Sequence, residues 1–220
     1  MECLLTFCAF KAAAPNSFFV SRGNHESEPI NRVHGFYDEC TRKYRNHQFF
    51  TIANQVLNTL PLAYVVDGRL FVVHGGLPAK ENFMLEDVRG IDRFRVPENG
   101  TLMSQLLWSD PQEMNGIHPS HRGEGILFGP DVTESFLKRN KLEMIIRSHV
   151  WQAEGYAIEQ SGKCVTIFSA PNYTGTTSYG AWINVRGGGQ KLEFVKFEAA
   201  EYQGKYEKPR PSAPIRGGWY

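Results

Sequence analysis

The sequence predicts an α/β fold in which buried strands alternate with helices and end in polar loops. Short apolar runs at residues 70–73, 142–146 and 164–168 each stop in a loop that carries polar or ionisable side chains. Between these runs, apolar residues recur three or four positions apart, which predicts helices. In folds of this kind, the loops after the carboxyl ends of buried strands are the usual place for a functional site.

Composition and charge place the chain among ordinary globular proteins and argue against some partners. The 220 residues are 41% hydrophobic and 21% charged, and a chain of this length is most simply one domain. The net charge of +1 argues against bulk electrostatic binding of nucleic acid or of an acidic membrane. Four scattered cysteines without a Cys-x-x-Cys pair favour reduced thiols in a cytoplasmic or nuclear protein, with Cys3 and Cys8 packed in the core.

The first predicted elements are a buried helix over residues 1–14 and a buried strand over residues 17–20. Apolar residues recur at helical spacing in the first segment, and Pro15 ends the helix. The apolar stretch is too short to span a bilayer, and Glu2 stands where a signal peptide would carry basic residues. We therefore predict no cleaved leader and no membrane span in this segment.

The middle of the chain predicts helices, a hairpin and a long loop. Helical patterns cover residues 36–57, whose aromatic side chains we interpret as core, and part of residues 85–94. Asp67-Gly68 is a turn signal that predicts a β-hairpin over residues 60–73. Residues 112–125 form a long polar loop, and loops of this length are often functional.

The C-terminal part predicts one capped helix followed by strands and a tail. Asp131 and Glu134 fit a capping pattern for a helix that ends near Asn140. Further strands are expected at residues 142–146, 164–168, 181–185 and 191–197, with a hairpin edge at 155–162. The segment from residue 199 onward is rich in Pro, Gly and charge, so we expect a loosely held tail.

Three strand tips bring together side chains that suit a metal ion. Asn24, His74 and His149 each follow an apolar run, and two imidazoles with an amide oxygen suit a borderline divalent ion such as Zn, Mn or Fe. The neighbouring His25 is of a type that titrates near neutral pH, and the planar fork of Arg122 binds phosphate oxygens bidentately. Each residue also has a plainer interpretation, as a structural histidine, a strand-capping turn or a solvated loop charge. Only their combination favours a site.

The polar loops contain seven motifs, in this order: Arg22-Gly23-Asn24-His25-Glu26, His74-Gly75-Gly76, Leu107-Trp108-Ser109-Asp110-Pro111, Arg122-Gly123, Phe128-Gly129-Pro130-Asp131, Arg147-Ser148-His149 and Ser169-Ala170-Pro171-Asn172-Tyr173. In order and approximate spacing they resemble the motifs of the phosphoprotein phosphatase family of serine/threonine phosphatases. The resemblance runs from Glu2 to about Phe197. It is greatest with the type 5 branch, through Arg147-Ser148-His149 and Ala153-Glu154-Gly155-Tyr156.

The resemblance implies a dinuclear metallophosphoesterase, with a central β-sandwich flanked by helices, that hydrolyses phosphoserine and phosphothreonine in proteins. One of its two divalent metal ions, Mn, Fe or Zn, would be held by three side chains: Asn24, His74 and His149. His25 would donate a proton to the leaving serine or threonine oxygen. Arg122 would hold the phosphoryl oxygens, and Tyr173 would line the substrate site.

Two earlier motifs of the family, Gly-Asp-x-His-Gly and Gly-Asp-x-Val-Asp-Arg-Gly, do not occur in this sequence. In the family they supply the other metal site and the bridging Asp, so we expect at most one well-formed metal site here. Met1 falls immediately past the second motif. We therefore interpret residues 1–198 as the C-terminal two-thirds of a catalytic domain that lacks its first βαβ segment, followed by a tail at 199–220. Val150 and the loop at residues 174–177 also differ from the type 5 branch, which leaves substrate preference open.

The ligands present in this chain limit its expected activity. Three neutral ligands without a bridging carboxylate do not offset the repulsion between two dications, so we expect little or no phosphatase activity from the chain alone. A missing first segment would also expose a sheet edge and apolar surface. Three functions stay open: a phosphatase acting on phosphoprotein substrates, a non-catalytic pseudophosphatase that binds phosphoproteins or a regulatory partner, and a structural module around a single zinc ion.

Overall fold

The computed structural model describes residues 1–188 and 191–201, and it contains the mixture of helices and strands that the sequence predicts. The helices are α1 Glu2–Ala13, α2 Glu28–Val33, α3 Phe36–Tyr44, α4 His47–Thr59, α5 Leu85–Arg89, α6 Leu102–Trp108 and α7 Pro130–Asn140. The strands are β1 Ala63–Val66, β2 Leu70–Val73, β3 Asp110–Pro111, β4 Ile117–Pro119, β5 Ile126–Phe128, β6 Met144–Arg147, β7 Tyr156–Glu159, β8 Cys164–Ile167, β9 Gly180–Arg186 and β10 Lys191–Phe197. No helix among the described residues is long and apolar enough to cross a membrane. The predicted tail lies, from residue 202 onward, outside the described residues.

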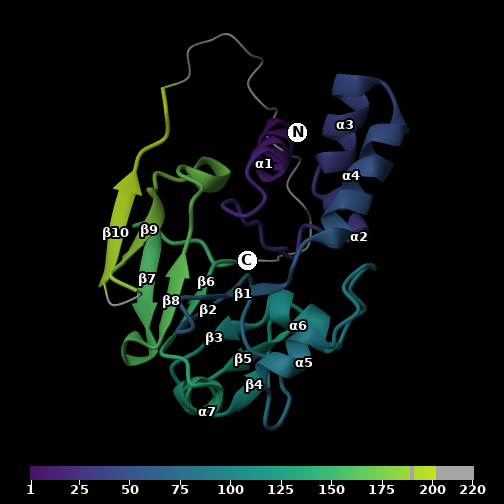
Figure 1. The fold of residues 1–220 in the computed structure, drawn as a ribbon. Helices are drawn as coiled ribbons and strands as arrows, with labels where there is room; N and C mark the ends of the chain where they lie inside the picture. Colours follow the sequence, from purple (N-terminus) through teal and green to yellow (C-terminus); the bar gives the residue numbers. More distant parts are fainter. Residues whose placement is uncertain (189–190, 202–220) are drawn as a thin grey trace.

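A five-stranded sheet with the order β1-β2-β6-β8-β7 forms the centre of the molecule (Figure 1). Strands β2, β6 and β8 run parallel, whereas β1 and β7 are antiparallel at the two edges. Phe71 pairs with Ile145, and Ile146 pairs with Val165, which fixes the register of the three parallel strands. Because parallel strands end at the same edge of a sheet, the loops after β2, β6 and β8 leave it together.

Most of the apolar core lies between this sheet and helices α6 and α7. Leu106, Leu107 and Ile145 are fully buried, and Phe136 of α7 meets Phe71 of β2 edge-on, with ring centroids 5.0 Å apart. Burial of each such side chain contributes roughly 1.5–3 kcal/mol. The cluster therefore holds in place the strands whose ends carry the polar loops.

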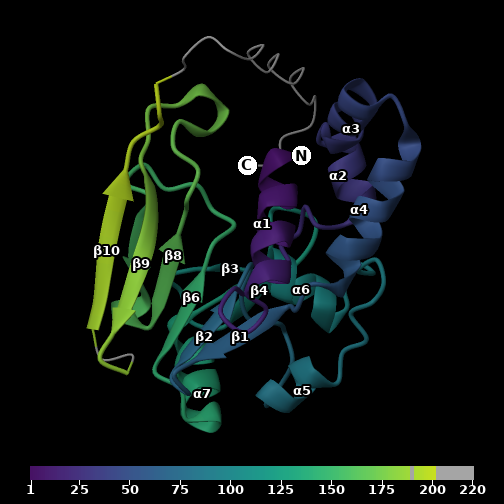
Figure 2. The ribbon, with the colours of Figure 1, turned by 45° about the horizontal axis from the view of Figure 1, so that its top comes forward.

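The remaining elements lie on either side of the central sheet in both ribbon views (Figures 1 and 2). Helices α2, α3 and α4 gather on one side, where Met1, Cys40 and Phe50 form a second, smaller buried cluster. The β9–β10 hairpin lies on the other side, beside β7 and β8, and the Ala181 N–H donates to the carbonyl of Phe168 at 3.0 Å. Helix α1 stands between the two sides.

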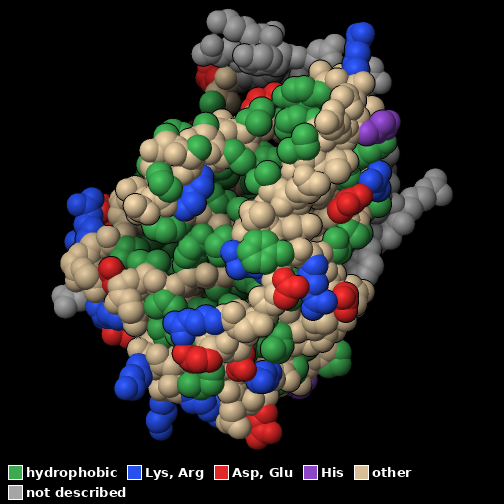
Figure 3. Space-filling view, turned by 45° about the vertical axis from the view of Figure 1, so that its right-hand side comes forward, with side chains coloured by type: hydrophobic (Ala, Val, Ile, Leu, Met, Phe, Trp, Pro, Cys, Tyr) green, Lys and Arg blue, Asp and Glu red, His purple; other side chains and the backbone are tan. Residues whose placement is uncertain are grey.

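The N-terminal segment departs from the sequence prediction in its burial. Helix α1 forms as expected, but none of its residues is buried and Cys3 is exposed, so the prediction of a buried helix with Cys3 and Cys8 in the core is wrong. Residues 17–20 form no strand, and Phe19 is 58% exposed. Figure 3 shows hydrophobic side chains gathered in a hollow on one face of the molecule. An apolar pattern becomes a buried element only where a neighbour covers it, and no described element covers this one.

Two local predictions in the second half of the chain are also corrected. Helix α7 begins at Pro130 with Gly129 as its N-cap, so the capping box at Asp131 does not form. The carboxylate of Asp131 instead accepts a hydrogen bond from the Gly116 N–H at 2.7 Å, which ties the preceding loop to the helix. Strand β4 interrupts the predicted loop at residues 112–125 and pairs with β5.

We expect Cys164 to resist alkylation in the folded protein. Burial raises the pKa of its thiol to about 12, so at pH 8 only about one thiol in ten thousand is the reactive thiolate. Exposed Cys3 should react readily. Mass spectrometry after treatment with iodoacetamide at pH 8 measures the alkylation rates of Cys3 and Cys164. In the control, the chain is unfolded in urea, and Cys164 should then react as well. Equal rates at Cys3 and Cys164 in the folded protein would contradict the burial of β8.

Candidate active site

Two histidines meet at the end of the sheet where the parallel strands β2 and β6 finish. His74 follows β2 directly and His149 lies two residues after β6, and their ring centroids are 5.0 Å apart. The Ser148 N–H donates to the carbonyl of His74 at 3.0 Å, so the two loops are tied to one another. His149 has a φ of 70°, a left-handed backbone conformation that is costly for a residue with a side chain and that often occurs at active sites and ligand-binding sites.

Asn24 joins the two histidines from the loop that precedes α2. Its Oδ1 lies 2.8 Å from His74 Nε2, and the residue is buried. The fully buried Arg22 holds the loop by donating to three backbone carbonyls and one amide oxygen. The Gly23 N–H donates to the carboxylate of Glu26 at 2.8 Å and closes the turn. The Arg-Gly-Asn-His-Glu motif is therefore a rigid turn that presents Asn24 to His74.

Burial keeps both imidazoles neutral, which is the form that binds metal ions. Desolvation, and then the charge of Arg147, lowers the pKa of His74 to about 3. Desolvation, and then the neighbouring His74, lowers the pKa of His149. The Nε2 atom of His149 is buried and has no hydrogen-bond partner among the described residues. A buried imidazole nitrogen in this state fits a metal ligand, so a divalent ion suits this group.

The ligand set suits one ion rather than two. Within residues 1–188 and 191–201, no group of three or more His, Cys, Asp or Glu side chains is placed to hold a metal ion. The set formed by Asn24, His74 and His149 has two imidazoles and one amide and carries no negative charge. Two dications side by side would repel one another there without compensation. These residues therefore support one metal site of the two that the resemblance implies.

A buried carboxylate holds Arg122 at the rim of this group. Arg122 Nε donates to Asp110 Oδ2 at 2.6 Å, and its side chain is only 17% exposed. The other oxygen of Asp110 accepts a hydrogen bond from the fully buried Arg147 at 2.7 Å. Arg147 Nε in turn donates to the carbonyl of Gly75 at 2.6 Å, next to His74. Asp110 thus positions both the Arg122 side chain and the loop that carries His74.

A cleft of about 1080 Å³ is lined by all six predicted site residues: Asn24, His25, His74, Arg122, His149 and Tyr173. The His25 ring lies against that of His34, with centroids 4.5 Å apart. Desolvation by the cleft, and then His34, lowers the pKa of His25 to about 4, although the residue as a whole is exposed. Tyr173 is 43% exposed and meets Phe168 edge-on at 5.1 Å. The structure therefore brings the predicted residues together around one cavity.

Comparison with known proteins decides the family. The calcineurin-like phosphoesterase family matches residues 2–152, which include the Asn24 loop, His74, Arg122 and His149. The chain belongs to the calcineurin-like phosphoesterase family. Membership in this metallophosphoesterase family implies divalent metal ions, and it agrees with the mixed α/β fold that the sequence predicts.

The curated relatives of this phosphoesterase are named serine/threonine phosphatases. Serine/threonine-protein phosphatase T of Trypanosoma brucei brucei is 46% identical over 207 residues, which cover 93% of this chain and 43% of the relative. Serine/threonine-protein phosphatase 5 of Arabidopsis thaliana is 44% identical over 201 residues, covering 91% of this chain and 35% of the relative. Serine/threonine-protein phosphatase 5 of Rattus norvegicus is 41% identical over 203 residues, which cover 92% of this chain and 40% of the relative. This phosphoesterase chain therefore spans less than half the length of these relatives.

A solved structure shares the phosphoesterase fold. It is a protein serine/threonine phosphatase from Saccharomyces cerevisiae with similarity to human phosphatase PP5, and it superposes with a TM-score of 0.86 at 42% identity. The match covers 92% of this chain and 67% of that chain. The predicted metallophosphoesterase fold and the resemblance to the type 5 branch are both confirmed.

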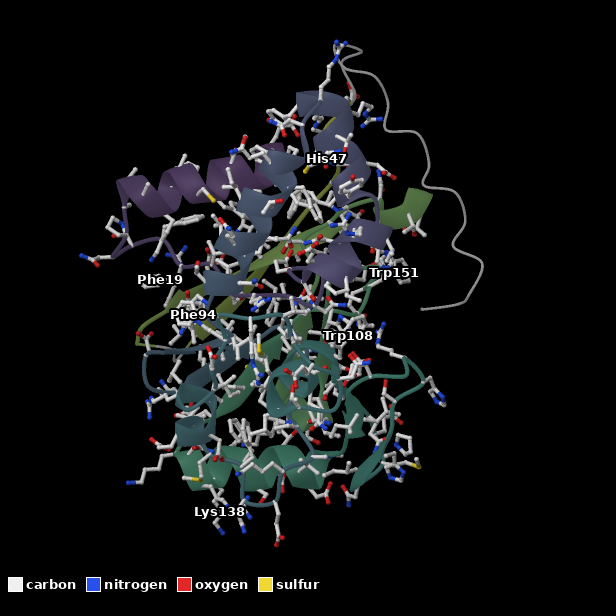
Figure 4. All side chains as sticks on the ribbon, turned by 90° about the vertical axis from the view of Figure 1, so that its right-hand side faces the viewer. Phe19, His47, Phe94, Trp108, Lys138 and Trp151 are labelled. Atoms are coloured by element: carbon white, nitrogen blue, oxygen red, sulfur yellow. The ribbon has the colours of Figure 1, made fainter. Side chains whose placement is uncertain are left out.

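Three residues that shape the phosphoesterase cleft had no predicted role. Asp110 lies in a recognised motif, but its contact with two arginines from distant parts of the chain is visible only in three dimensions. His34 was assigned no chemistry, yet it faces His25. Trp151 lines the cleft and is 41% exposed, and Figure 4 shows it on the same side of the molecule as Trp108. A tryptophan two residues after a predicted ligand was the signal that could have found it.

We expect the Gly75→Ala substitution to destabilise the phosphoesterase by about 1–3 kcal/mol, because the added carbon cannot be accommodated. A Cβ at Gly75 would lie 2.6 Å from the backbone of Leu107 and of Trp108, closer than real Cβ atoms approach such atoms. At Gly90, by contrast, a Cβ would lie 3.6 Å from its nearest neighbours, so Gly90→Ala is the matched control. Urea denaturation of both variants measures the difference in stability. Equal stability would mean that the loop after β2 can move away from the C-terminal turn of α6 at no cost.

Proposed function

We propose that this chain takes part in the metal-dependent hydrolysis of phosphoserine and phosphothreonine in proteins. One observation supports this most directly. The buried Nε2 of His149, which has no hydrogen-bond partner in the described part of the chain, lies beside His74 and Asn24 in a cleft that Arg122 also lines. A neutral metal-binding group next to a positively charged fork suits a phosphoryl group bound between a metal ion and an arginine. The names of the relatives support the same reaction class.

In this proposal the roles of the metal-binding and phosphate-binding residues differ. Asn24, His74 and His149 hold a divalent ion, for which Mn, Fe and Zn are the candidates. When bound, such an ion polarises a phosphoryl oxygen and lowers the pKa of a water molecule that it holds. Arg122 binds the phosphoryl oxygens from the rim. Because Nε of Arg122 donates to Asp110, the two terminal nitrogens of its guanidinium are the donors that would bind the phosphoryl oxygens.

His25 is proposed as the proton donor to the leaving oxygen. Its position beside Asn24 at the mouth of the cleft supports this role. Its pKa of about 4 makes it neutral at neutral pH, so it needs a nearby negative charge to become an effective acid. A bound phosphate group supplies that charge and raises the pKa of the imidazole. Tyr173 also lines the cleft and is 43% exposed, and we propose that it lines the path of the substrate.

The isolated chain is proposed to bind phosphoproteins more readily than it hydrolyses them. Its metal ligands are neutral, and neither of the two Asp-containing motifs of phosphoprotein phosphatases occurs in the 220 residues. The second candidate function is therefore that of a pseudophosphatase, which binds phosphoproteins or a regulatory protein without turnover. We propose phosphoproteins as its partners, and a cytoplasmic or nuclear location because the four scattered cysteines without a Cys-x-x-Cys pair favour reduced thiols.

Binding and turnover of one phosphopeptide separate these candidates. The purified chain is mixed with Mn²⁺ and a phosphothreonine peptide, and both calorimetric binding and phosphate release are measured. Robust metal-dependent release supports the phosphatase and overturns the expectation of low activity. Binding without release, lost in Arg122→Ala but kept in the exposed control Arg89→Ala, supports the pseudophosphatase. Absence of binding would sink both. A melting temperature unchanged by chelator would dispose of the structural zinc module.

A further inference from the structure

A loop that lines the cleft contains an Asn-Gly pair. Residues 97–100 form the polar loop Pro-Glu-Asn-Gly that precedes α6, and Pro97 and Asn99 line the cleft. Asn99 and Gly100 are both exposed, and Gly100 has a φ of 75°. A Cβ at Gly100 would meet no atom within 4 Å, so the pair is not packed against the rest of the protein. The proposed reaction gives this loop no role.

An exposed Asn-Gly pair is reactive because its own main chain can attack the asparagine side chain. The Gly100 nitrogen adds to Cγ of Asn99, the Cγ–Nδ2 bond breaks, and ammonia leaves with the proton that the Gly100 nitrogen gives up. The succinimide that results takes up one water molecule and opens to aspartate or isoaspartate. Glycine hinders this attack least, because it has no Cβ and its backbone is the most permissive. Water is the only co-reactant of the whole conversion.

Gly100 is held in place only by long hydrogen bonds. Its N–H donates to Glu124 Oε1 at 3.1 Å, and its carbonyl accepts from Gln105 Nε2 at 3.4 Å. The turn is closed by the Thr101 N–H, which lies 3.3 Å from the carbonyl of Glu98. Two of these three distances exceed the usual length of a protein hydrogen bond. The loop can therefore rotate into the geometry of attack, and the Glu124 carboxylate is placed to accept the proton of the Gly100 N–H.

The other Asn-Gly pair of the chain, Asn115-Gly116, is held much more firmly. The Gly116 N–H donates to the carboxylate of Asp131 at 2.7 Å, and its carbonyl accepts from the Gly129 N–H at 2.9 Å. The Cα of Asn115 lies only 2.7 Å from the position that a Cβ on Gly129 would take, so the two backbones are in close contact. Asn115 is not one of the residues that line the cleft. This pair is an internal control with the same dipeptide sequence.

Conversion of Asn99 would add a negative charge to a cleft that we propose binds phosphate. The new carboxylate would lie next to Gly100, which is bonded to Glu124. Arg122 precedes Glu124 by two residues, which places their Cα atoms at most about 7 Å apart. Charges at this range still interact at moderate salt. Isoaspartate would also lengthen the main chain before Gly100 and move its N–H away from Glu124.

We propose that Asn99 is a site of spontaneous deamidation, and that its conversion to aspartate or isoaspartate weakens phosphate binding in the cleft. The first half stands on the Asn99-Gly100 loop alone, whereas the second half rests on the proposed function. The protein would then lose affinity for phosphoproteins as it ages, at a rate set by this loop rather than by a modifying enzyme.

Peptide mapping by mass spectrometry tests the modification in the full chain. After incubation at pH 8, we expect conversion of Asn99 to be severalfold faster than conversion of Asn115. Gly100→Ala should slow the conversion of Asn99 severalfold, because the added methyl group hinders the attack. In the chain unfolded with guanidinium chloride, the two asparagines should convert at similar rates. Absence of conversion at Asn99, or equal rates at Asn99 and Asn115 in the folded protein, overturns the proposal.

Two aspartate variants test the effect on binding. With Mn²⁺ present, Asn99→Asp should bind a phosphothreonine peptide about threefold more weakly than the wild type at low salt, and added salt should reduce the difference. Asn115→Asp should bind like the wild type, and thermal melts check that both variants fold. Equal binding by Asn99→Asp and the wild type would overturn the second half of the proposal. Absence of binding by the wild type would sink the proposed function and this second half together, while the mass measurement would still decide the first half.

Discussion

Replacement of Asp110 by alanine is expected to lower the free energy of unfolding by about 3–5 kcal/mol, the usual cost of breaking a buried ion pair on one side. Asp110 is the carboxylate partner of both Arg122 and Arg147, at 2.6 and 2.7 Å. The Arg147 side chain is fully buried, so its charge would remain in the interior without compensation. Urea denaturation followed by circular dichroism measures the loss.

Two further variants distinguish the buried charge from a simple loss of packing. Adding Arg147→Met to Asp110→Ala removes the uncompensated charge, so the double variant should be more stable than the single one. Glu86→Ala breaks the exposed pair with Arg89, in which both side chains are more than two-thirds exposed, and should leave stability unchanged. If Asp110→Ala is no less stable than Glu86→Ala, the buried network does not hold the site loops.

The parts of the fold that the sequence predicts best are those that depend on local chemistry. Asp67 and Gly68 both adopt positive φ in the β1–β2 turn, as an Asp-Gly hairpin requires. The sequence could identify His74 and His149 as site residues because each lies in the loop that follows a strand, so its position in the chain places it at a strand end. Once β2 and β6 pair in parallel, their tips must meet, and the 5.0 Å ring separation follows from that pairing.

The sequence predictions that were wrong or missing concern residues whose contacts come from distant parts of the chain. Residues 17–20 have the pattern of a buried strand, but a strand needs a partner for its ladder, and Phe19 stays 58% exposed. Asp131 has the sequence context of a capping residue, yet its carboxylate accepts a hydrogen bond from the Gly116 N–H instead of capping α7. Asp110 was visible as part of a motif, but its role follows from arginines 12 and 37 positions away. Pattern alone does not determine such contacts.

We expect a divalent metal ion to stabilise the wild-type chain, and we expect this stabilisation to be lost in His149→Ala. The structure offers one neutral ligand set at Asn24, His74 and His149. A divalent ion that binds only the folded state stabilises it by about 2.7 kcal/mol at one hundred times its Kd. We expect Zn²⁺ or Mn²⁺ to raise the melting temperature of the wild-type chain, and we expect no such rise in His149→Ala. Differential scanning fluorimetry and metal analysis after dialysis measure both.

His47→Ala is the matched control, because His47, the first residue of α4, does not line the cleft. Its Nδ1 lies 2.7 Å from the Tyr37 hydroxyl, and Figure 4 shows it above Trp151 and Trp108. His47→Ala should lower stability slightly and leave the metal response intact. One bound ion per chain in the wild type, and none in His149→Ala, would show that the neutral set works alone. Two bound ions would contradict the charge argument, since nothing in the Asn24–His74–His149 group offsets the repulsion between two dications. That stoichiometry decides whether the isolated chain has half of a dinuclear centre or all of it.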